Sequence, residues 1–281
     1  MFEDLLEDPV GVGSRIAMRA GYSDNDLPVR QVGSYHPAGS TEIKLFDVGA
    51  VPLVFKDGGI AYGAATFRLE QRSKSQVGAA VTACYLPWGP HEAYRISLKK
   101  IDDEIRLFFT APLDGCAVVV EGTPEAPVVY HANASGVEPA ASPLSDPAVL
   151  EMVALKLLDK RNAAMFAAYR AFPGDLDSFS DAMKSGAITP LEYGVLVGRP
   201  SEQREKAALL RNLELPGWFA RTGWKAKPKD LTFHKSTGAV FGVRKSGSWA
   251  FYQQKIMDLQ EGSFVLSCGE FWPRGFRRDT V

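Results

Sequence analysis

The sequence has few of the residues that mark disulfide-rich, membrane-spanning or nucleic-acid-binding proteins. Its 281 residues include three cysteines, and so small and odd a number argues against a disulfide framework and for reduced thiols. No run approaches the roughly 18 consecutive apolar residues of a membrane span. The formal net charge is −1, so no overall field attracts nucleic acid or an anionic membrane.

The common motifs for cofactors and targeting are also missing. The sequence contains no Cys-x-x-Cys, no His-Glu-x-x-His and no Walker A loop, and "GVGS" at residues 11–14 lacks the rest of a dinucleotide fingerprint. We therefore expect no metal and no cofactor. The N-terminal segment "MFEDLLEDPVGVG" is acidic and does not read as a secretory signal peptide. If the protein is exported, it would leave the cell by a route that this chain does not encode, or as part of a larger protein.

Short apolar or alternating runs make up much of the first half of the chain. Apolar residues account for 46% and charged residues for 23% of the total, which is ordinary for a soluble globular protein. The runs fall between residues 45 and 131 and are separated by Gly, Pro, Asp and Asn, as strands are. The strand pattern returns after Trp218, where "VFGVRKSGSWAFYQQ" predicts a hairpin that turns at residues 245–248.

A helical pattern separates the two strand regions. Asp146 can cap a helix and Pro147 suits its first position. Apolar residues then recur at helical spacing as far as Phe172, and two shorter helices are expected at 176–184 and 202–212. Strands followed by helices and then strands favour an α+β fold. We predict a β-sandwich core of mixed sheets flanked by helices and long loops, in a single domain over residues 1–281. Residues 136–146 are the alternative boundary.

One predicted hairpin brings a cysteine and a histidine together. If residues 122–125 form its loop, Cys116 lies directly opposite His131. Opposed residues of an antiparallel pair have Cβ atoms about 4.5–5.5 Å apart on the same face. The spacing therefore predicts a Cys–His ion pair, in which the imidazolium lowers the thiol pKa and leaves a nucleophilic thiolate. The tight turn at residues 112–116 would present backbone N–H groups as an oxyanion hole.

Two structural readings compete with this one. Unpaired cysteines are usually small buried apolar residues, and a one-residue bulge would place the two side chains on opposite faces.

We take Cys84 and Cys268 as core residues. Asn133 is either part of a glycosylation sequon or a polar neighbour of the site. The aromatic and basic segment 217–235 is either a loop packed on the sheet or a binding patch for a partner or nucleic acid.

"LDGC" ending at Cys116, with His131 fifteen residues on, resembles the Leu-x-Gly-Cys…His signature of the cytotoxic necrotizing factor catalytic domain. Related glutamine deamidases include a Burkholderia lethal factor and the chemotaxis-receptor deamidases. Several carry a threonine six residues before the cysteine, the position of Thr110 here. The match covers about 25 residues, from Thr110 to Asn133. The family fold is a β-sandwich flanked by helices and long loops.

The resemblance implies a toxin or effector that deamidates a glutamine of a host protein, with Rho-family GTPases as the leading substrates. Cys116 would attack the carboxamide and expel ammonia, His131 would act as general acid and base, and Thr110 would orient the histidine. A backbone carbonyl, which we expect near residues 81–84, would complete the site. The protein would be secreted or injected and act as a monomer in the host cytosol, with no nucleic-acid partner and no membrane span.

Three alternatives use the same residues differently. If an amine resolves the thioester, the site is a transglutaminase. The same Cys–His pair also suits a cysteine peptidase or an acyltransferase, which would cleave a chain or transfer a group without releasing ammonia. A non-enzymatic β-rich binding module predicts instead that Cys116 is buried and unreactive.

Overall fold

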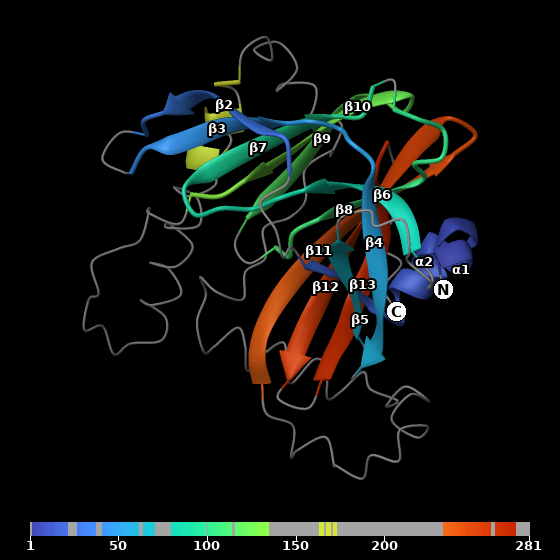
Figure 1. Cartoon of the computed structure of the whole chain (residues 1–281). Helices are drawn as coiled ribbons and strands as arrows, with labels where there is room; N and C mark the ends of the chain where they lie inside the picture. The colour runs from blue at the N-terminus through green and yellow to red at the C-terminus, as the bar shows by residue number, and fades with distance from the viewer. Residues whose placement is uncertain are drawn as a thin grey trace, which may run out of the picture.

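A computed structural model describes most of the N-terminal half of the chain and the C-terminal strands (Figure 1). The described residues are 2–21, 27–37, 41–61, 64–70, 80–99, 101–113, 116–134, 163–165, 167–169, 171–172, 233–259 and 262–273. They form two sheets with few helices, so the β-rich α+β class predicted from the sequence is confirmed. No helix among them is long and apolar enough to cross a membrane.

The larger sheet has eight strands and joins both ends of the chain. Its strands, in spatial order, are β1 (Ala17–Gly21), β5 (Ala64–Glu70), β4 (Leu53–Ala61), β6 (Ala80–Leu86), β8 (Leu107–Thr110), β11 (Phe233–Lys245), β12 (Ser248–Leu259) and β13 (Gly262–Trp272). Two of the pairs, β1 with β5 and β6 with β8, are parallel. The sheet is therefore mixed, as expected.

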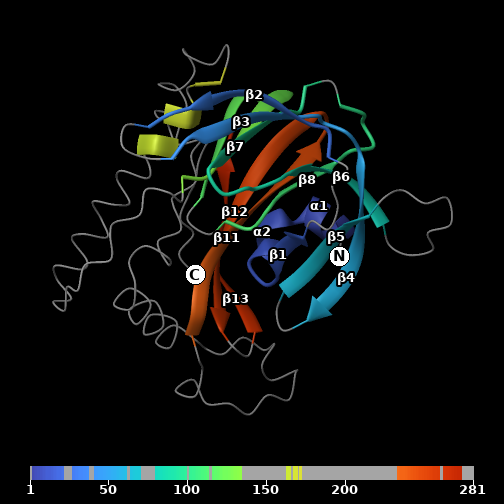
Figure 2. The ribbon, with the colours of Figure 1, turned by 60° about the vertical axis from the view of Figure 1, so that its left-hand side comes forward.

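The smaller sheet has five strands and holds the predicted Cys–His hairpin. In spatial order they are β2 (Val29–Tyr35), β3 (Ile43–Val48), β7 (Glu92–Ser97), β10 (Ala126–Ala132) and β9 (Ala117–Thr123). Residues 87–91 lead from β6 of the larger sheet to β7 of the smaller one. The strands of the two sheets run in different directions where the layers meet, as the views in Figures 1 and 2 show.

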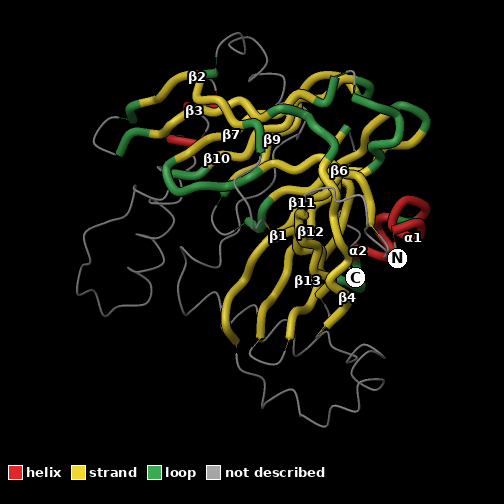
Figure 3. The backbone as a smooth tube through the Cα atoms, in the orientation of Figure 1, coloured by secondary structure: helices red, strands yellow, loops and turns green. Residues whose placement is uncertain are grey.

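Neighbouring residues along a strand point to opposite faces of the sheet and so pack in different layers of the interior. Phe108, Val118 and Val129 belong to the core cluster between the two sheets. The intervening Phe109 instead packs with the N-terminal helices α1 (Phe2–Glu7) and α2 (Pro9–Gly13), on the other face of the larger sheet. Val119 faces outward from the smaller sheet, toward the helical residues within 163–172. Figure 3 shows these helical segments outside the two sheets.

Most of the strand predictions are confirmed, and the hairpin at residues 245–248 is confirmed closely. Lys245 pairs with Ser248, and both Ser246 and Gly247 have positive φ, as a tight I′-type turn requires. The strands β1 and β2 and the helices α1 and α2 were not predicted. The first half of the predicted 146–172 helix, the helices expected at 176–184 and 202–212, and residues 217–232 of the aromatic and basic segment lie outside the described residues. The last three residues of that segment, 233–235, form the start of β11.

Gln254 joins the N-terminal segment to β12, and replacing it is expected to destabilise the fold. Its Nε2 donates to the carbonyls of Gly13 and Ile16, at 2.5 and 2.8 Å, and its Oε1 accepts from the Met18 N–H at 2.8 Å. Gln254→Leu leaves these backbone groups without partners, at an expected cost of about 3 kcal/mol or more. Urea unfolding measures this. Gln253→Leu, at a half-buried neighbour, is the control and should cost less than about 1 kcal/mol.

Candidate active site

The hairpin of β9 and β10 has a different register from the predicted one. Ala126 pairs with Thr123, so the turn contains two residues, Pro124 and Glu125, instead of four. Gly122, assigned to the loop from sequence, lies in β9 with φ +89°. The shorter turn shifts the pairing by two residues, and His131 faces Val118. The prediction that Cys116 lies directly opposite His131 is therefore wrong.

Because the pairing shifts by two residues, Cys116 and His131 remain on the same face of the sheet. The residue opposite Cys116 changes. Ala132 pairs with Ala117, which places Asn133 opposite Cys116 at the next position. The Nδ2 of Asn133 donates to the Cys116 Sγ at 3.0 Å. His131 is then a diagonal neighbour of Cys116, and such positions lie about 7–8 Å apart between Cα atoms. Cys116, His131 and Asn133 all face the space between the sheets.

Asn133 is held from both sides. Its backbone N–H donates to the Glu92 carbonyl at 2.9 Å, and its Oδ1 accepts from the His91 N–H at 3.4 Å. His91 has a positive φ of 57°, so the chain turns sharply as it enters β7. The amide is thereby oriented with its N–H₂ group toward the thiol. An amide donor at this distance stabilises a thiolate more than a neutral thiol.

His131 is the least satisfied polar side chain of the site. It is 1% exposed, and neither Nδ1 nor Nε2 has a hydrogen-bond partner of good geometry among the described residues. Burial lowers its pKa from 6.5 to about 3, and the nearby Pro87 carbonyl opposes this only in part. The Pro87 carbonyl is therefore close enough to raise the histidine pKa but too poorly aligned to form a hydrogen bond with the ring. The imidazole is neutral at pH 7, so the predicted Cys–His ion pair is not the state of this conformation.

The other predicted site residues lie elsewhere. The Thr110 hydroxyl is within hydrogen-bond distance of the Ala111 and Val240 carbonyls, at 2.9 and 3.3 Å. It therefore bonds main chain in the larger sheet and does not orient His131 through a hydrogen bond. The carbonyl beside the imidazole belongs to Pro87, not to residues 81–84, which lie within β6 and pair with β4 and β8. The sequence did contain a signal for a turn at this place, since Pro87 begins the Pro-Trp-Gly-Pro segment that follows β6.

The remaining cysteines fit the core assignment. Cys84 is fully buried in the cluster between the sheets, and burial raises its pKa to about 12. Cys268 is half-buried against the cluster under α1 and α2, and burial also raises its pKa to about 12. Neither contacts the site through any hydrogen bond that the structure shows. Among the described residues, neither sulfur accepts from a side-chain amide as that of Cys116 does.

The thiol of Cys116 is expected to react slowly in the native protein, because it is 0% exposed. Alkylation by iodoacetamide then requires a local opening of the fold. We expect its rate at pH 7 to be at least about 10²-fold lower than in urea-unfolded protein. Peptide mass spectrometry over a time course measures both rates. Equal rates would show that the thiol lies open to solvent.

No protein-family model and no curated protein sequence matches the chain. A proposal for the function of this chain therefore rests on the geometry of the site and on the short motif that ends at Cys116.

Proposed function

We propose that this protein is a protein-glutamine deamidase of the cytotoxic necrotizing factor type, with Cys116 as nucleophile and His131 as general base and acid. The observation that carries the proposal is the arrangement at the open end of the β9–β10 hairpin. A thiol held by the Asn133 amide lies on the same face as a neutral imidazole, and neither ring nitrogen has a hydrogen-bond partner of good geometry among the described residues. A neutral imidazole is the form that accepts a proton from a thiol.

The steps follow from these groups. The Cys116 thiol gives its proton to His131 as the sulfur attacks the carboxamide carbon of a glutamine. The imidazolium returns that proton to the leaving nitrogen, the C–N bond breaks, and ammonia departs from a thioester. Neutral His131 then takes a proton from water, which attacks the thioester carbon. The C–S bond breaks, the sulfur regains a proton, and the product is glutamate.

Asn133 has a positioning role in this proposal. Its Nδ2 lies 3.0 Å from the sulfur, so the hydrogen bond strengthens as negative charge develops on sulfur. The Pro87 carbonyl stabilises the imidazolium that forms during the reaction, because proximity to a carbonyl raises the histidine pKa. Both effects favour the charged pair once substrate is bound. In the resting site the imidazole is neutral.

The complete burial of Cys116 and His131 favours one alternative, a non-enzymatic β-rich module in which both are core residues. The deamidase proposal instead requires the site to open when a substrate binds. Incubation of purified Rho-family GTPases, and then of a host-cell lysate, with the protein distinguishes the two. Peptide mass spectrometry and an ammonia assay are the readouts, with a reaction lacking the protein as control.

The outcomes separate the reaction classes. Conversion of glutamine to glutamate with ammonia release supports deamidation. Ammonia release with an amine attached to the glutamine indicates a transglutaminase. Chain cleavage or group transfer without ammonia indicates a peptidase or an acyltransferase, and contradicts the proposal. If all of these substrates remain unchanged, the binding module is the better account.

Trp88 supports a macromolecular substrate. Its side chain is 46% exposed, unusual for so large an apolar residue, and it follows Pro87, whose carbonyl lies beside His131. Exposed tryptophans often anchor protein partners. We expect Trp88→Ala to raise KM about tenfold with little change in kcat. Val29→Ala, at an exposed valine on β2, is the control. Unchanged kinetics for Trp88→Ala would remove it from the substrate interface.

A further inference from the structure

The row of residues that holds the Cys116 thiol continues across the smaller sheet to a carboxylate. The Asn133 N–H donates to the Glu92 carbonyl at 2.9 Å, one position beyond the pairing of Ala132 with Ala93, so Glu92 lies opposite Asn133 on β7. On its other side Asn133 donates its amide to Cys116. Directly opposed residues share a face of the sheet. Glu92, Asn133 and Cys116 therefore follow one another across three strands on one face.

The Glu92 carboxylate is held in place beside the turn that follows β6. Its Oε2 accepts a hydrogen bond from the hydroxyl of Tyr94, whose ring belongs to the core cluster between the sheets. It also lies against Gly89, where a β-carbon would overlap the carboxylate. Gly89 follows the exposed Trp88. The carboxylate thus borders the turn that carries both Trp88 and the Pro87 carbonyl beside the imidazole.

Glu92 is the part of this row that solvent reaches. Cys116 and His131 are 0% and 1% exposed, whereas Glu92 is half-buried. Among the described residues the Glu92 carboxylate makes no ion pair, and the Tyr94 hydroxyl is its one hydrogen-bond donor there. A carboxylate has about four acceptor positions and binds cationic donors most strongly. It therefore has the capacity to bind a cation that approaches the site.

The row continues beyond Glu92 to Lys44 on β3, on the side away from Cys116. Lys44 pairs with Glu92 in the parallel register of β3 and β7, but it is exposed and forms no ion pair with Glu92. A charge in water that makes no close contact is strongly screened. Lys44 therefore offsets the charge of Glu92 only in part, and one strand further from the thiol than Glu92 is.

We propose that Glu92 selects glutamines that have a lysine or arginine close by in the substrate chain. The inference rests on the deamidase function proposed above. Two strand spacings separate β7 from β9, or about 10 Å, which about three residues of an extended chain span. A basic side chain within three residues of a glutamine bound at Cys116 thus reaches the Glu92 carboxylate, and an acidic one is repelled. The substrate is therefore a basic segment of a protein.

A set of synthetic peptides tests this with the full chain at low ionic strength. Each peptide has one central glutamine, flanked within three residues by lysine, norleucine or glutamate, and mass spectrometry gives its deamidation rate. The lysine peptides are expected to react about tenfold faster than the glutamate peptides, with norleucine between them. Added salt should reduce this ratio, because it screens the charges. Equal rates would overturn this inference alone. If no peptide is deamidated, the proposed function fails with it.

Variants at Glu92 and Lys44 should change the ratio of the lysine to the glutamate rate in opposite directions. Glu92→Gln keeps an acceptor for the Tyr94 hydroxyl and should bring the ratio close to one. Glu92→Lys should reverse the preference, so that the glutamate peptides react faster. Lys44→Gln should increase the ratio severalfold, because a competing cation is removed. Both rates are measured on one variant, so the ratio does not depend on the fraction of molecules that fold.

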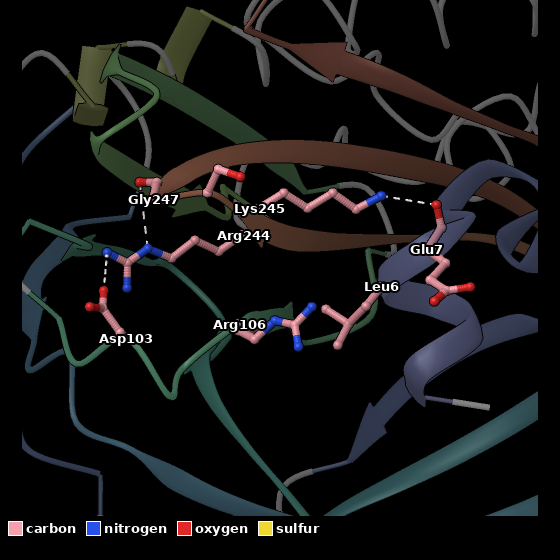
Figure 4. A pocket seen from close by; sticks show the side chains of 8 residues that line it. Leu6, Glu7, Asp103, Arg106, Arg244, Lys245 and Gly247 are labelled. Atoms are coloured by element: carbon pink, nitrogen blue, oxygen red, sulfur yellow. Dashed lines mark hydrogen bonds and ion pairs between the residues drawn. The ribbon is translucent and has the colours of Figure 1, made fainter.

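Asp103→Asn is the matched control for the loss of one negative charge. The Asp103 side chain is 98% exposed and pairs with Arg244 at 3.1 Å, beside the turn between β11 and β12 and outside the site around Cys116 (Figure 4). Its replacement should leave the ratio unchanged. An equal loss of preference in Asp103→Asn would show an effect of net charge, and a preference kept in Glu92→Gln would show that another group sets it. Either result would overturn the proposal.

Discussion

Replacing His131 with phenylalanine is expected to remove a large part of the acid sensitivity of the fold. Burial lowers the histidine pKa from 6.5 to about 3 in the folded state. Above pH 6.5 the imidazole is neutral in both states. As the pH falls below 6.5, the unfolded chain takes up a proton that the folded chain refuses, so this group reduces stability by about 1.4 kcal/mol per pH unit until about pH 3.

The expected difference between His131→Phe and the wild type follows directly. The variant should gain about 3 kcal/mol relative to the wild type between pH 7 and pH 4. At pH 7 it should be no less stable, because a phenyl ring has no buried nitrogens that need partners. Urea unfolding at several pH values measures this. His36→Gln is the control, because the His36 side chain is 71% exposed.

The sign of the result also reports on the ionisation of the site. If Cys116 and His131 formed an ion pair in the folded protein, the histidine pKa would be raised and not lowered. Stability from that pair would then be lost on raising the pH through the folded pKa, and the variant would be relatively weakest in acid. That outcome would contradict the neutral resting state and would restore the ion pair expected from sequence.

Burying the neutral His131 imidazole lowers the stability of the fold, and such a loss of stability is typical of functional sites. Within the part of the chain that the structure describes, the buried imidazole lacks a well-aligned partner for either nitrogen, which destabilises the fold, and a phenyl ring would pack there without that penalty. Residues that break local rules in this way concentrate at functional sites. His131→Phe should therefore be at least as stable as the wild type at pH 7 and have no deamidase activity.

The local signals in the sequence predicted much of the fold. The continuous run of apolar, mostly β-branched residues on β9 and the Ser246–Gly247 turn chemistry each specify their own conformation, and both agree with the structure. The capping signal of α2 was also readable, since the Asp8 side chain accepts from the Gly11 N–H and Pro9 follows it. It was missed because a five-residue helix carries almost no periodicity.

The geometry of the site was less predictable. Gly122 and Pro124 both suit a turn, so the sequence alone did not decide between a four-residue and a two-residue loop. That choice moves the partner of Cys116 from His131 to Asn133. The Pro87 carbonyl reaches the imidazole through a crossing between the two sheets, and no local pattern encodes such a crossing. Burial of the pair likewise depends on how the sheets pack.

If the proposed deamidase activity is correct, Cys116→Ser is expected to lower its rate by about 10³-fold or more while leaving the fold intact. A hydroxyl ionises far less readily than a thiol, and a base with a pKa of about 3 cannot compensate for that. The serine Oγ still accepts the Asn133 hydrogen bond, so stability should change by less than about 1.5 kcal/mol. Glutamine-to-glutamate conversion followed by mass spectrometry gives the rates.

Cys84→Ser supplies the matched control, because Cys84 is equally buried between the sheets but its sulfur accepts from no side-chain amide of the described residues. It should lose stability, by about 1–3 kcal/mol, since its sulfur lies 4.0 Å from the Val51 carbonyl in an otherwise apolar cluster. Its activity per folded molecule should be unchanged. If both serine variants keep full activity, the chemistry does not use a thiol at all. If Cys84→Ser alone is inactive, the nucleophile lies in the larger sheet and the role assigned to the β9–β10 hairpin is wrong.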